Sequence, residues 1–310
     1  MTLTVILFFL GLAMVVFGSD FLVDGASSVA RKFKISEFVI GIIIVGFGTS
    51  CPELVVSVTG AIEGSSDIAI GNVIGSNIMN ILLILGLTAA LSPIAISDNN
   101  KKKDIPILLI FTLFFCLTCL DGLINRVDAL MYLLLFVFYI FYNFRSGKKD
   151  FTPEEESKEY SLVLSILLII VGLAGLVIGG KLFVDNAVTI AQSIGASEKF
   201  IAITVLALGT SLPELVTCVV AAVKKKGQLA LGNIVGSNVF NILLILGCSG
   251  LINPLNTAAL NYVDLSVCIA SVVLLFVFAF TSKKQQLSKG AGCTLLALEL
   301  AYMIFLFIKH

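Results

Sequence analysis

Long apolar segments alternate with short polar joins along the whole sequence. A helix that crosses a bilayer needs about 20 mostly apolar residues, and ten segments approach or exceed that length. They lie at 3–24, 36–62, 68–92, 105–121, 127–144, 161–184, 197–222, 228–252, 262–281 and 291–308. The pattern predicts an all-α polytopic membrane protein with ten transmembrane helices.

Composition indicates the same class and narrows the chemistry. Of the 310 residues, 58% are hydrophobic and 13% are charged, a balance that excludes a soluble globular domain. The formal net charge of +0 gives no indication of nucleic-acid binding. The single histidine is the last residue, His310, which argues against a histidine metal site or proton relay. Cys116 and Cys119 form a CxxC motif inside an apolar run, where buried thiols are favoured over redox chemistry.

The two halves of the chain repeat each other. Residues 19–86 align with 180–247 without a gap, at a constant shift of 161 positions. "GTSCPELV" at 48–55 meets "GTSLPELV" at 209–216, and "GNVIGSNIMNILLILG" meets "GNIVGSNVFNILLILG" with 12 of 16 positions identical. Such self-similarity indicates duplication. The expected units are 1–144, with a first repeat at about 36–88, and 161–310, with a second at about 197–249, joined by the charged linker 145–160.

Each half contains five expected helices, so the second half must enter the membrane inverted relative to the first. The basic residues support this, because cytoplasmic joins are enriched in Lys and Arg. With the N-terminus outside, sixteen of the 20 basic residues lie inside, and only Arg126, Lys181, Lys199 and Lys309 lie outside. We therefore expect a multi-pass protein of the cell membrane with both termini outside and the 145–160 linker in the cytoplasm.

The repeated segments carry a polar face inside apolar helices. Positions spaced at i, i+3, i+4 and i+7 share one side of a helix, and the next helix of each half adds a Ser and an Asn at i, i+4. The first half offers Gly46, Thr49, Ser50, Glu53, Ser76 and Asn80, and the second offers Ala207, Thr210, Ser211, Glu214, Ser237 and Asn241. Every polar side chain in this set presents an oxygen.

A proline precedes each glutamate and interrupts the helix that carries it. Pro52 cannot donate to the carbonyl of Gly48, and Pro213 cannot donate to that of Gly209. Carbonyls freed in this way need another partner inside a membrane, and bound cations are one such partner in transporters. The GxxxG pairs Gly71/Gly75 and Gly232/Gly236 are expected to allow close helix packing around the same region.

The glutamates are the strongest indication of a cation site. An unpaired carboxylate at mid-bilayer costs from about 2.5 to more than 10 kcal/mol, and these helices contain no Lys or Arg in their cores. Interhelical hydrogen bonds would explain any single Thr, Ser or Asn, and protonation would relieve a glutamate. Recurrence of the whole set favours a cation. An all-oxygen set suits Ca²⁺ or Na⁺, and two ionised glutamates balance one Ca²⁺ or two Na⁺.

These motifs resemble the sodium/calcium exchanger branch, prokaryotic type, of the Ca²⁺/cation antiporter superfamily over the full chain. The resemblance implies ten helices in two inverted five-helix repeats, with discontinuous helices at the ion site. It implies that the twelve residues of the polar face, Gly46 and Ala207 through main-chain oxygens, are ion ligands. Cation/proton exchangers of the superfamily have a glutamate in the second motif, which is absent here. Some potassium-dependent relatives carry Asp where this chain has Asn241.

The expected function is antiport of Na⁺ and Ca²⁺ by alternating access at a midplane site, with the first and sixth helices sliding against the core. Proton-coupled or potassium-dependent antiport is the alternative, and a passive cation channel is another. An enzyme is not expected, because no catalytic His, paired Asp or HExxH motif occurs. We expect a monomer in the lipid bilayer, with Ca²⁺ and Na⁺ as substrates, and no cofactor or nucleic-acid partner. Asp24 and Asp185 are interpreted as interfacial caps or gate contacts, and Glu299 has no obvious partner.

Overall fold

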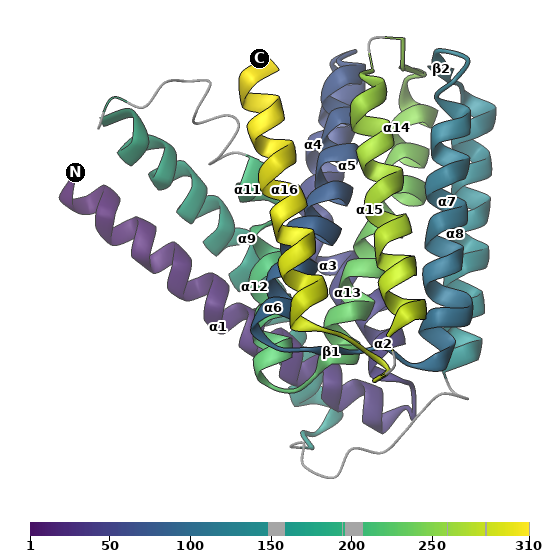
Figure 1. Cartoon of the computed structure of the whole chain (residues 1–310). Helices are drawn as coiled ribbons and strands as arrows, with labels where there is room; N and C mark the ends of the chain where they lie inside the picture. The colour runs from purple at the N-terminus through teal and green to yellow at the C-terminus, as the bar shows by residue number, and fades with distance from the viewer. Residues whose placement is uncertain (148–158, 194, 196–206, 259, 283, 310) are drawn as a thin grey trace.

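The computed structural model describes residues 1–147, 159–193, 195, 207–258, 260–282 and 284–309 (Figure 1). The first half contains α1 (Thr2–Lys32), α2 (Glu37–Ile40), η1 (Gly41–Gly46), α3 (Phe47–Thr49), α4 (Cys51–Ile62), α5 (Ser66–Met79), η2 (Asn80–Leu85), α6 (Gly86–Leu91), β1 (Ile94–Ala95), η3 (Asn100–Asp104), α7 (Ile105–Thr118), β2 (Leu123–Ile124) and α8 (Arg126–Gly147). The elements labelled η are π-helical.

The second half has the same plan in its described part. It contains α9 (Leu162–Ser193), α11 (Ala207–Thr210), α12 (Leu212–Val223), α13 (Gly227–Val239), η5 (Phe240–Ile245), α14 (Leu246–Ile252), β3 (Leu255–Asn256), α15 (Tyr262–Thr281), β4 (Gln286–Leu287) and α16 (Lys289–Lys309). Most of the expected linker 145–160, and the start of the helix expected at 197–222, lie outside the described residues.

Each of the ten expected segments contains a helix in the described part of the chain. Seven helices are long and apolar enough to cross a membrane, and the bent pair Glu37–Thr49 and Cys51–Ile62 makes up to eight. Of the other two segments, 105–121 holds α7, which continues directly from η3. The second holds the short apolar helix Leu212–Val223. The prediction of a polytopic all-helical protein is therefore confirmed.

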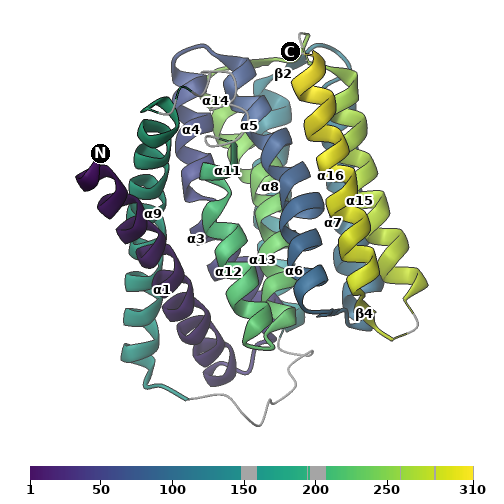
Figure 2. The ribbon, with the colours of Figure 1, turned by 60° about the vertical axis from the view of Figure 1, so that its left-hand side comes forward.

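The two halves run in opposite directions. In Figures 1 and 2, α1 runs from the end that carries both termini to the opposite end, whereas α9 begins at that opposite end and returns. Two short antiparallel ribbons join the halves. One pairs Ile94 of β1 with Leu287 of β4, and the other pairs Leu123 of β2 with Asn256 of β3. Each ribbon therefore takes one strand from each half.

The helices that carry the repeated motifs occupy the centre. The best spanning windows of Ser66–Leu91 and Gly227–Ile252 are 72% and 94% buried, whereas those of the other long helices are only 22% to 33% buried. The peripheral helices present apolar side chains outward, as lipid-facing helices do. The central helices contain the π-helical stretches η2 and η5, and such stretches frequently mark functional sites. Asn80 begins η2, and Asn241 lies in the first turn of η5.

The first and sixth expected helices are longer than predicted. We expected ends near residues 24 and 184, but α1 continues to Lys32 and α9 to Ser193. The extra turns of α1 pack against α9, where the Ser165 hydroxyl donates to the Ser28 hydroxyl at 2.8 Å. Asp24 and Asp185 therefore lie inside helices and do not cap their ends.

Glycines hold α1 and α9 together as one pair. A Cβ at Gly11 would lie 2.6 Å from the backbone of Phe183, and one at Gly18 would lie 2.8 Å from Gly172 O. A Cβ at Gly25 would lie 2.7 Å from Ser165 O. The two backbones thus touch along the whole interface, as small residues allow in membranes. In Figure 1 this pair leans away from the other helices toward the end with the N-terminus.

Candidate functional site

The helix that carries each glutamate is broken just before it. Between α3 and α4 the chain bends by 50°, and Ser50 at the break has φ −83° and ψ 6°. Ser211 has nearly the same angles, φ −89° and ψ 4°, between α11 and α12. Pro52 and Pro213 occupy the first turn of the helix that follows, where a missing N–H is tolerated. The discontinuous helices implied by the sequence are present.

Glu53 and Glu214 come from opposite halves and lie near each other in the centre of the protein. Each is 1% exposed, and their charges are close enough to repel. The Ser50 hydroxyl donates to Glu214 Oε1 at 3.3 Å, which links the two broken helices directly. The hydroxyls of Thr49 and Ser237 also lie beside the Glu214 carboxylate. The Ser76 hydroxyl occupies the equivalent place beside Glu53.

Several buried polar atoms in this region have no hydrogen-bond partner among the described residues. Most belong to predicted ligands, and one belongs to the neighbouring Asn238. They are Glu53 Oε2, Glu214 Oε2, Ser211 Oγ, Asn80 Oδ1, Asn241 Oδ1 and Asn238 Oδ1. Buried acceptors without donors are costly, and a cation would satisfy them. The ion pairs within the described ranges involve neither glutamate.

The main-chain oxygen of Gly46 belongs to the same group. It accepts from the Ser237 hydroxyl at 3.4 Å and from the Thr49 hydroxyl at 3.5 Å. Its counterpart, Ala207, lies in α11, but the contacts of its side chain lie outside the described part of the structure. Thr210, also in α11, is partly exposed, and its hydroxyl makes no hydrogen bond with the described residues. The structure thus brings most of the predicted face together, and the places of Ala207 and Thr210 in it stay predictions.

Four asparagines next to the predicted ligands were missed by the sequence reasoning as parts of the site. Asn233 Oδ1 accepts from the Thr49 hydroxyl at 3.1 Å, and Asn77 Oδ1 accepts from Asn241 Nδ2 at 2.9 Å. Asn77 Nδ2 in turn donates to Asn238 O at 3.4 Å. Asn72 Nδ2 donates to Glu53 O at 3.1 Å. The available signal was the repeat, because 72 and 77 fall on 233 and 238 at the shift of 161.

The asparagine pair fixes how Asn241 is turned. Because its Nδ2 donates to Asn77, its Oδ1 is the atom left without a donor. An amide held in this orientation presents an oxygen rather than an N–H to whatever lies beside it. A hydroxyl that donates to Asn233 likewise leaves the lone pairs of Thr49 available. These contacts orient neutral groups as oxygen donors for a cation.

The structure describes close neighbours for one GxxxG pair, Gly232/Gly236, but none for the other, Gly71/Gly75. A Cβ at Gly232 would lie 2.1 Å from Phe38 O, and one at Gly236 would lie 2.8 Å from Ile42 Cα. Close helix packing at this pair was predicted, and the structure identifies its partners as α2 and η1. Gly71 and Gly75 meet no described atom within 4 Å. Their equivalent neighbours at 199 and 203 lie outside the described residues, so this part stays a prediction.

Two other groups of the sequence analysis lie away from the site. Glu299 on α16 is 2% exposed, and its Oε2 has no described partner. The helix that carries it packs on η2 and α6 rather than on α4 or α12. Cys116 and Cys119 are free and buried, as are Cys218 and Cys268, and all seven cysteines are unpaired. Neither group adds to the oxygen set around the two glutamates.

Comparison with known proteins identifies the family that shares this arrangement. A family model described as sodium/calcium exchanger protein matches residues 3–145 and again 164–308. The sodium/calcium exchanger MaX1 of Methanosarcina acetivorans is 37% identical over 348 residues, covering 99% of each chain. The inner membrane protein YrbG of Escherichia coli strain K12 is 32% identical over 306 residues, covering 95% of this chain and 94% of that protein.

A solved structure agrees over nearly the same extent. The sodium-calcium exchanger NCX_Mj, soaked with zero Na⁺ and Ca²⁺, superposes with a TM-score of 0.87 at 36% identity, over 98% of this chain and 99% of that one. The whole-length agreement in sequence and fold shows a transporter rather than an enzyme, and a multi-pass membrane protein. The chain belongs to the sodium/calcium exchanger protein family.

Proposed function

We propose that this protein exchanges Na⁺ for Ca²⁺ across the membrane by alternating access at the site around Glu53 and Glu214. The observation that carries the proposal is the pair of buried carboxylates, one from each inverted half, with no cationic partner among the described residues. Around them, buried oxygens lack donors. Such a group is costly to leave charged and empty, and bound cations would remove that cost.

The oxygen ligands around the two glutamates favour hard cations. We propose ligands at Glu53, Glu214 and the hydroxyl and amide oxygens around them, with main-chain oxygens at Gly46 and Ala207. The remaining ligands are Thr49, Ser50, Thr210, Ser211, Ser76, Ser237, Asn80 and Asn241. Ca²⁺ takes six to eight oxygens of these types, and two carboxylates balance either one Ca²⁺ or two Na⁺. Competition between these two loads for one cage produces exchange.

The relatives support the choice of ions. MaX1 is named a sodium/calcium exchanger. NCX_Mj is named a sodium-calcium exchanger and was soaked with Na⁺ together with Ca²⁺ or Sr²⁺. This chain matches both over almost its whole length, and the polar face described above is the feature that would bind the same cations.

The negative charge of the empty site couples the movement of Na⁺ to that of Ca²⁺. Two carboxylates that repel each other in the protein interior oppose any closed, ion-free state. One bound Ca²⁺ or two bound Na⁺ remove that penalty, so the site changes the membrane face to which it is open only when ions occupy it. The pair α1 and α9 is suited to move, because α9 contacts both broken helices: Leu173 faces Gly48, and Val184 faces Gly209.

We propose the topology that the basic residues indicate. The elements that carry most of the Lys and Arg residues end at the side opposite the two termini (Figure 2), so that side is cytoplasmic and the termini are outside. The repeats are then 1–144 and 161–310, joined by a cytoplasmic linker at 145–160. The double match of the family model supports this division.

Transport in proteoliposomes tests the function. Vesicles loaded with Na⁺ and diluted into Na⁺-free medium with radiolabelled Ca²⁺ should accumulate Ca²⁺, and a Na⁺ ionophore should abolish the uptake. Uptake that ignores the Na⁺ gradient would remove sodium from the mechanism. Replacing the Na⁺ gradient with a pH gradient tests proton coupling. Adding and withholding K⁺ tests potassium dependence, which is not expected with an amide at position 241.

Thr49→Val should weaken Ca²⁺ binding without unfolding the protein. The change is nearly isosteric and removes the hydroxyl between Asn233 and Glu214. Loss of an oxygen ligand in a charged site is worth about 1.5–3 kcal/mol, so the Ca²⁺ concentration for half-maximal uptake should rise roughly ten- to a hundredfold. Thr88→Val is the matched control, because among the described residues the buried Thr88 hydroxyl donates only to Ile84 O, one turn earlier. Equal effects of the two changes would contradict the ligand assignment.

A further inference from the structure

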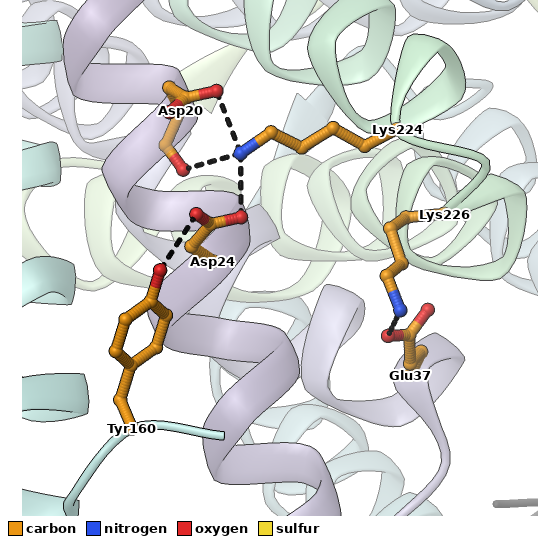
Figure 3. A network of polar contacts seen from close by, with 6 residues as sticks. All are labelled: Asp20, Asp24, Glu37, Tyr160, Lys224 and Lys226. Carbon is orange, nitrogen blue, oxygen red and sulfur yellow. Dashed lines mark hydrogen bonds and ion pairs between the residues drawn. The ribbon is translucent and has the colours of Figure 1, made fainter. Parts of the chain in front are cut away.

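Two ion pairs fasten α1 to the core at the end opposite the termini. Lys224 follows α12, and its Nζ lies 2.7 Å from Asp20 Oδ1 and 2.6 Å from Asp24 Oδ1 (Figure 3). Nζ also donates to Asp20 O at 3.4 Å. Tyr160, just before α9, donates through its hydroxyl to Asp24 Oδ2 at 3.4 Å. We call Asp20, Asp24 and Lys224 the inner latch.

The inner latch is more than a surface contact. The side chain of Lys224 is 26% exposed, so the pairs are partly shielded from solvent. Burial by itself would lower the pKa of Lys224, but the hydrogen bonds to Asp20 and Asp24 outweigh it and raise the pKa. A third ion pair at this end, Lys226 with Glu37 at 2.9 Å, joins core elements to each other and involves neither α1 nor α9.

The inner latch therefore connects two bodies that the proposed mechanism moves against each other. One is the glycine-packed pair α1 and α9, and the other is the core that holds Glu53 and Glu214. Apart from the latch, a single hydrogen bond between α1 and α12 is described, and it joins the hydroxyls of Ser19 and Thr217 at 3.3 Å. Sliding of the pair would have to break the two ion pairs of Lys224.

The repeat places an equivalent set of charges at the other end, with the signs exchanged. At the shift of 161, Asp20 falls on Lys181 and Lys224 falls on Glu63. Lys181 lies in α9, and Glu63 follows α4. Both side chains are exposed, and the ion pairs between described residues include neither. A lysine within an apolar, lipid-facing helix is costly without a partner.

We propose that Lys181 and Glu63 form an outer latch that closes the opposite end when the inner latch opens. This rests on the proposed alternating access, in which the inverted repeats exchange conformations. Movement of α1 and α9 toward the end with the termini separates Asp20 from Lys224 and brings Lys181 to Glu63. Each end thus has its own charged fastening, and only one can be closed at a time.

The inner latch has more attractive charge contacts than the outer latch, and this difference determines which state is favoured without ions. Lys224 faces two carboxylates, so both contacts of the inner latch are attractive. Asp24 falls on Asp185 in the repeat, with no change of sign. In the outer latch, the attraction between Lys181 and Glu63 is therefore opposed by repulsion between Glu63 and the neighbouring Asp185. The state with the inner latch closed, which this structure shows, is the favoured one without ions.

Chemical cross-linking tests the outer latch without relying on transport. Cysteines at 63 and 181 are joined with a short bifunctional thiol reagent, the protein is denatured, and a protease site placed in the linker is cut. Cross-linked halves then migrate as one band. The single changes Glu63→Cys and Lys181→Cys control for the native cysteines. Cysteines at 20 and 224 are the positive control, and their yield should fall as the 63–181 yield rises in Na⁺ and Ca²⁺.

Charge removal tests the balance between the two states. The ratio of apparent Ca²⁺ affinities at the two membrane faces reports this equilibrium. Lys224→Gln should raise the apparent Ca²⁺ affinity at the inner face, relative to that at the outer face, by about fivefold, the effect of losing about 1 kcal/mol. Asp185→Asn should shift it in the same direction, and Lys181→Gln in the opposite one. Lys225→Gln removes an exposed charge beside Lys224 and should leave the ratio unchanged.

The outcomes separate this proposal from the proposed function. If wild-type protein shows Na⁺-driven uptake but the 63–181 yield never exceeds that of the single-cysteine controls, the outer latch is wrong. Shifts of the same sign for Lys181→Gln and Lys224→Gln would overturn it as well, because a general folding defect has no side preference. If the cross-link forms while uptake ignores Na⁺, the latch stands and only the coupling ion is wrong.

Discussion

Replacing Glu53 by Gln should abolish Na⁺-driven Ca²⁺ uptake, and Glu214→Gln should do the same. Each change keeps the shape of the side chain and removes half of the negative charge that balances Ca²⁺. Loss of one partner from a buried charged group costs about 3 kcal/mol or more, which corresponds to more than about a hundredfold in affinity. Radiolabelled Ca²⁺ uptake into Na⁺-loaded proteoliposomes is the measurement.

A stability readout separates loss of binding from loss of folding. Without ions the two glutamates repel each other in a buried setting, so either Gln variant should melt at a higher temperature than wild type in ion-free detergent. Added Ca²⁺ should stabilise wild type and leave the variants nearly unchanged, because stabilisation by a ligand follows its affinity for the folded state.

Glu299→Gln is the matched control for both glutamates. It also neutralises a buried carboxyl in the membrane, but on α16, away from the two broken helices. Uptake should therefore survive this change. Substantial uptake in Glu53→Gln or Glu214→Gln, or a loss in Glu299→Gln as large as theirs, would show that the charge of the proposed site is not what drives exchange.

Gly232→Ala should disrupt the packing of α13 on α2 and remove transport with it. The added Cβ would lie 2.1 Å from Phe38 O, a backbone atom that no side-chain rotation can move away. Overpacking of this kind costs about 1–3 kcal/mol. Because α13 also carries Asn233 and Ser237, its displacement separates the partners of Thr49 and Gly46.

The measurement is the melting temperature in detergent together with Ca²⁺ uptake, both of which should fall. Gly180→Ala is the matched control, since its added Cβ would make only an ordinary contact, 3.9 Å from the Pro213 ring. Wild-type stability and uptake in Gly232→Ala would mean that α13 and α2 are not packed backbone to backbone.

Most of the fold was predictable because membrane proteins repeat a simple physical rule. Only helices and closed β-barrels satisfy the backbone inside lipid, and continuous apolar segments of this length fit helices, so apolar length located all ten segments. Helix ends were less predictable. The turns of α1 beyond residue 24 and of α9 beyond 184 are polar enough to read as joins, yet both stay helical. Those of α1 pack against the start of α9, where the Ser165 hydroxyl donates to the Ser28 hydroxyl.

The candidate site was predictable in its charged members and incomplete in its neutral ones. Glu53 and Glu214 stand out because a carboxylate in an apolar helix has no ordinary structural use. Asn77 and Asn233 give no such signal, because a buried asparagine is readily explained by a hydrogen bond between helices. Their contacts with Asn241 and Thr49 join residues 164 and 184 positions apart, and no local pattern predicts such pairs.

The sequence by itself determined the class, the duplication and the inversion, and it predicted the oxygen chemistry, because each follows from composition, spacing or charge along the chain. Only the tertiary structure decided which neutral groups orient the ligands and which helices touch through glycine. It alone paired Lys224 with Asp20 and Asp24, about 200 positions away. Contacts across inverted halves depend on how separate helices dock, and docking depends on shapes that no single segment contains.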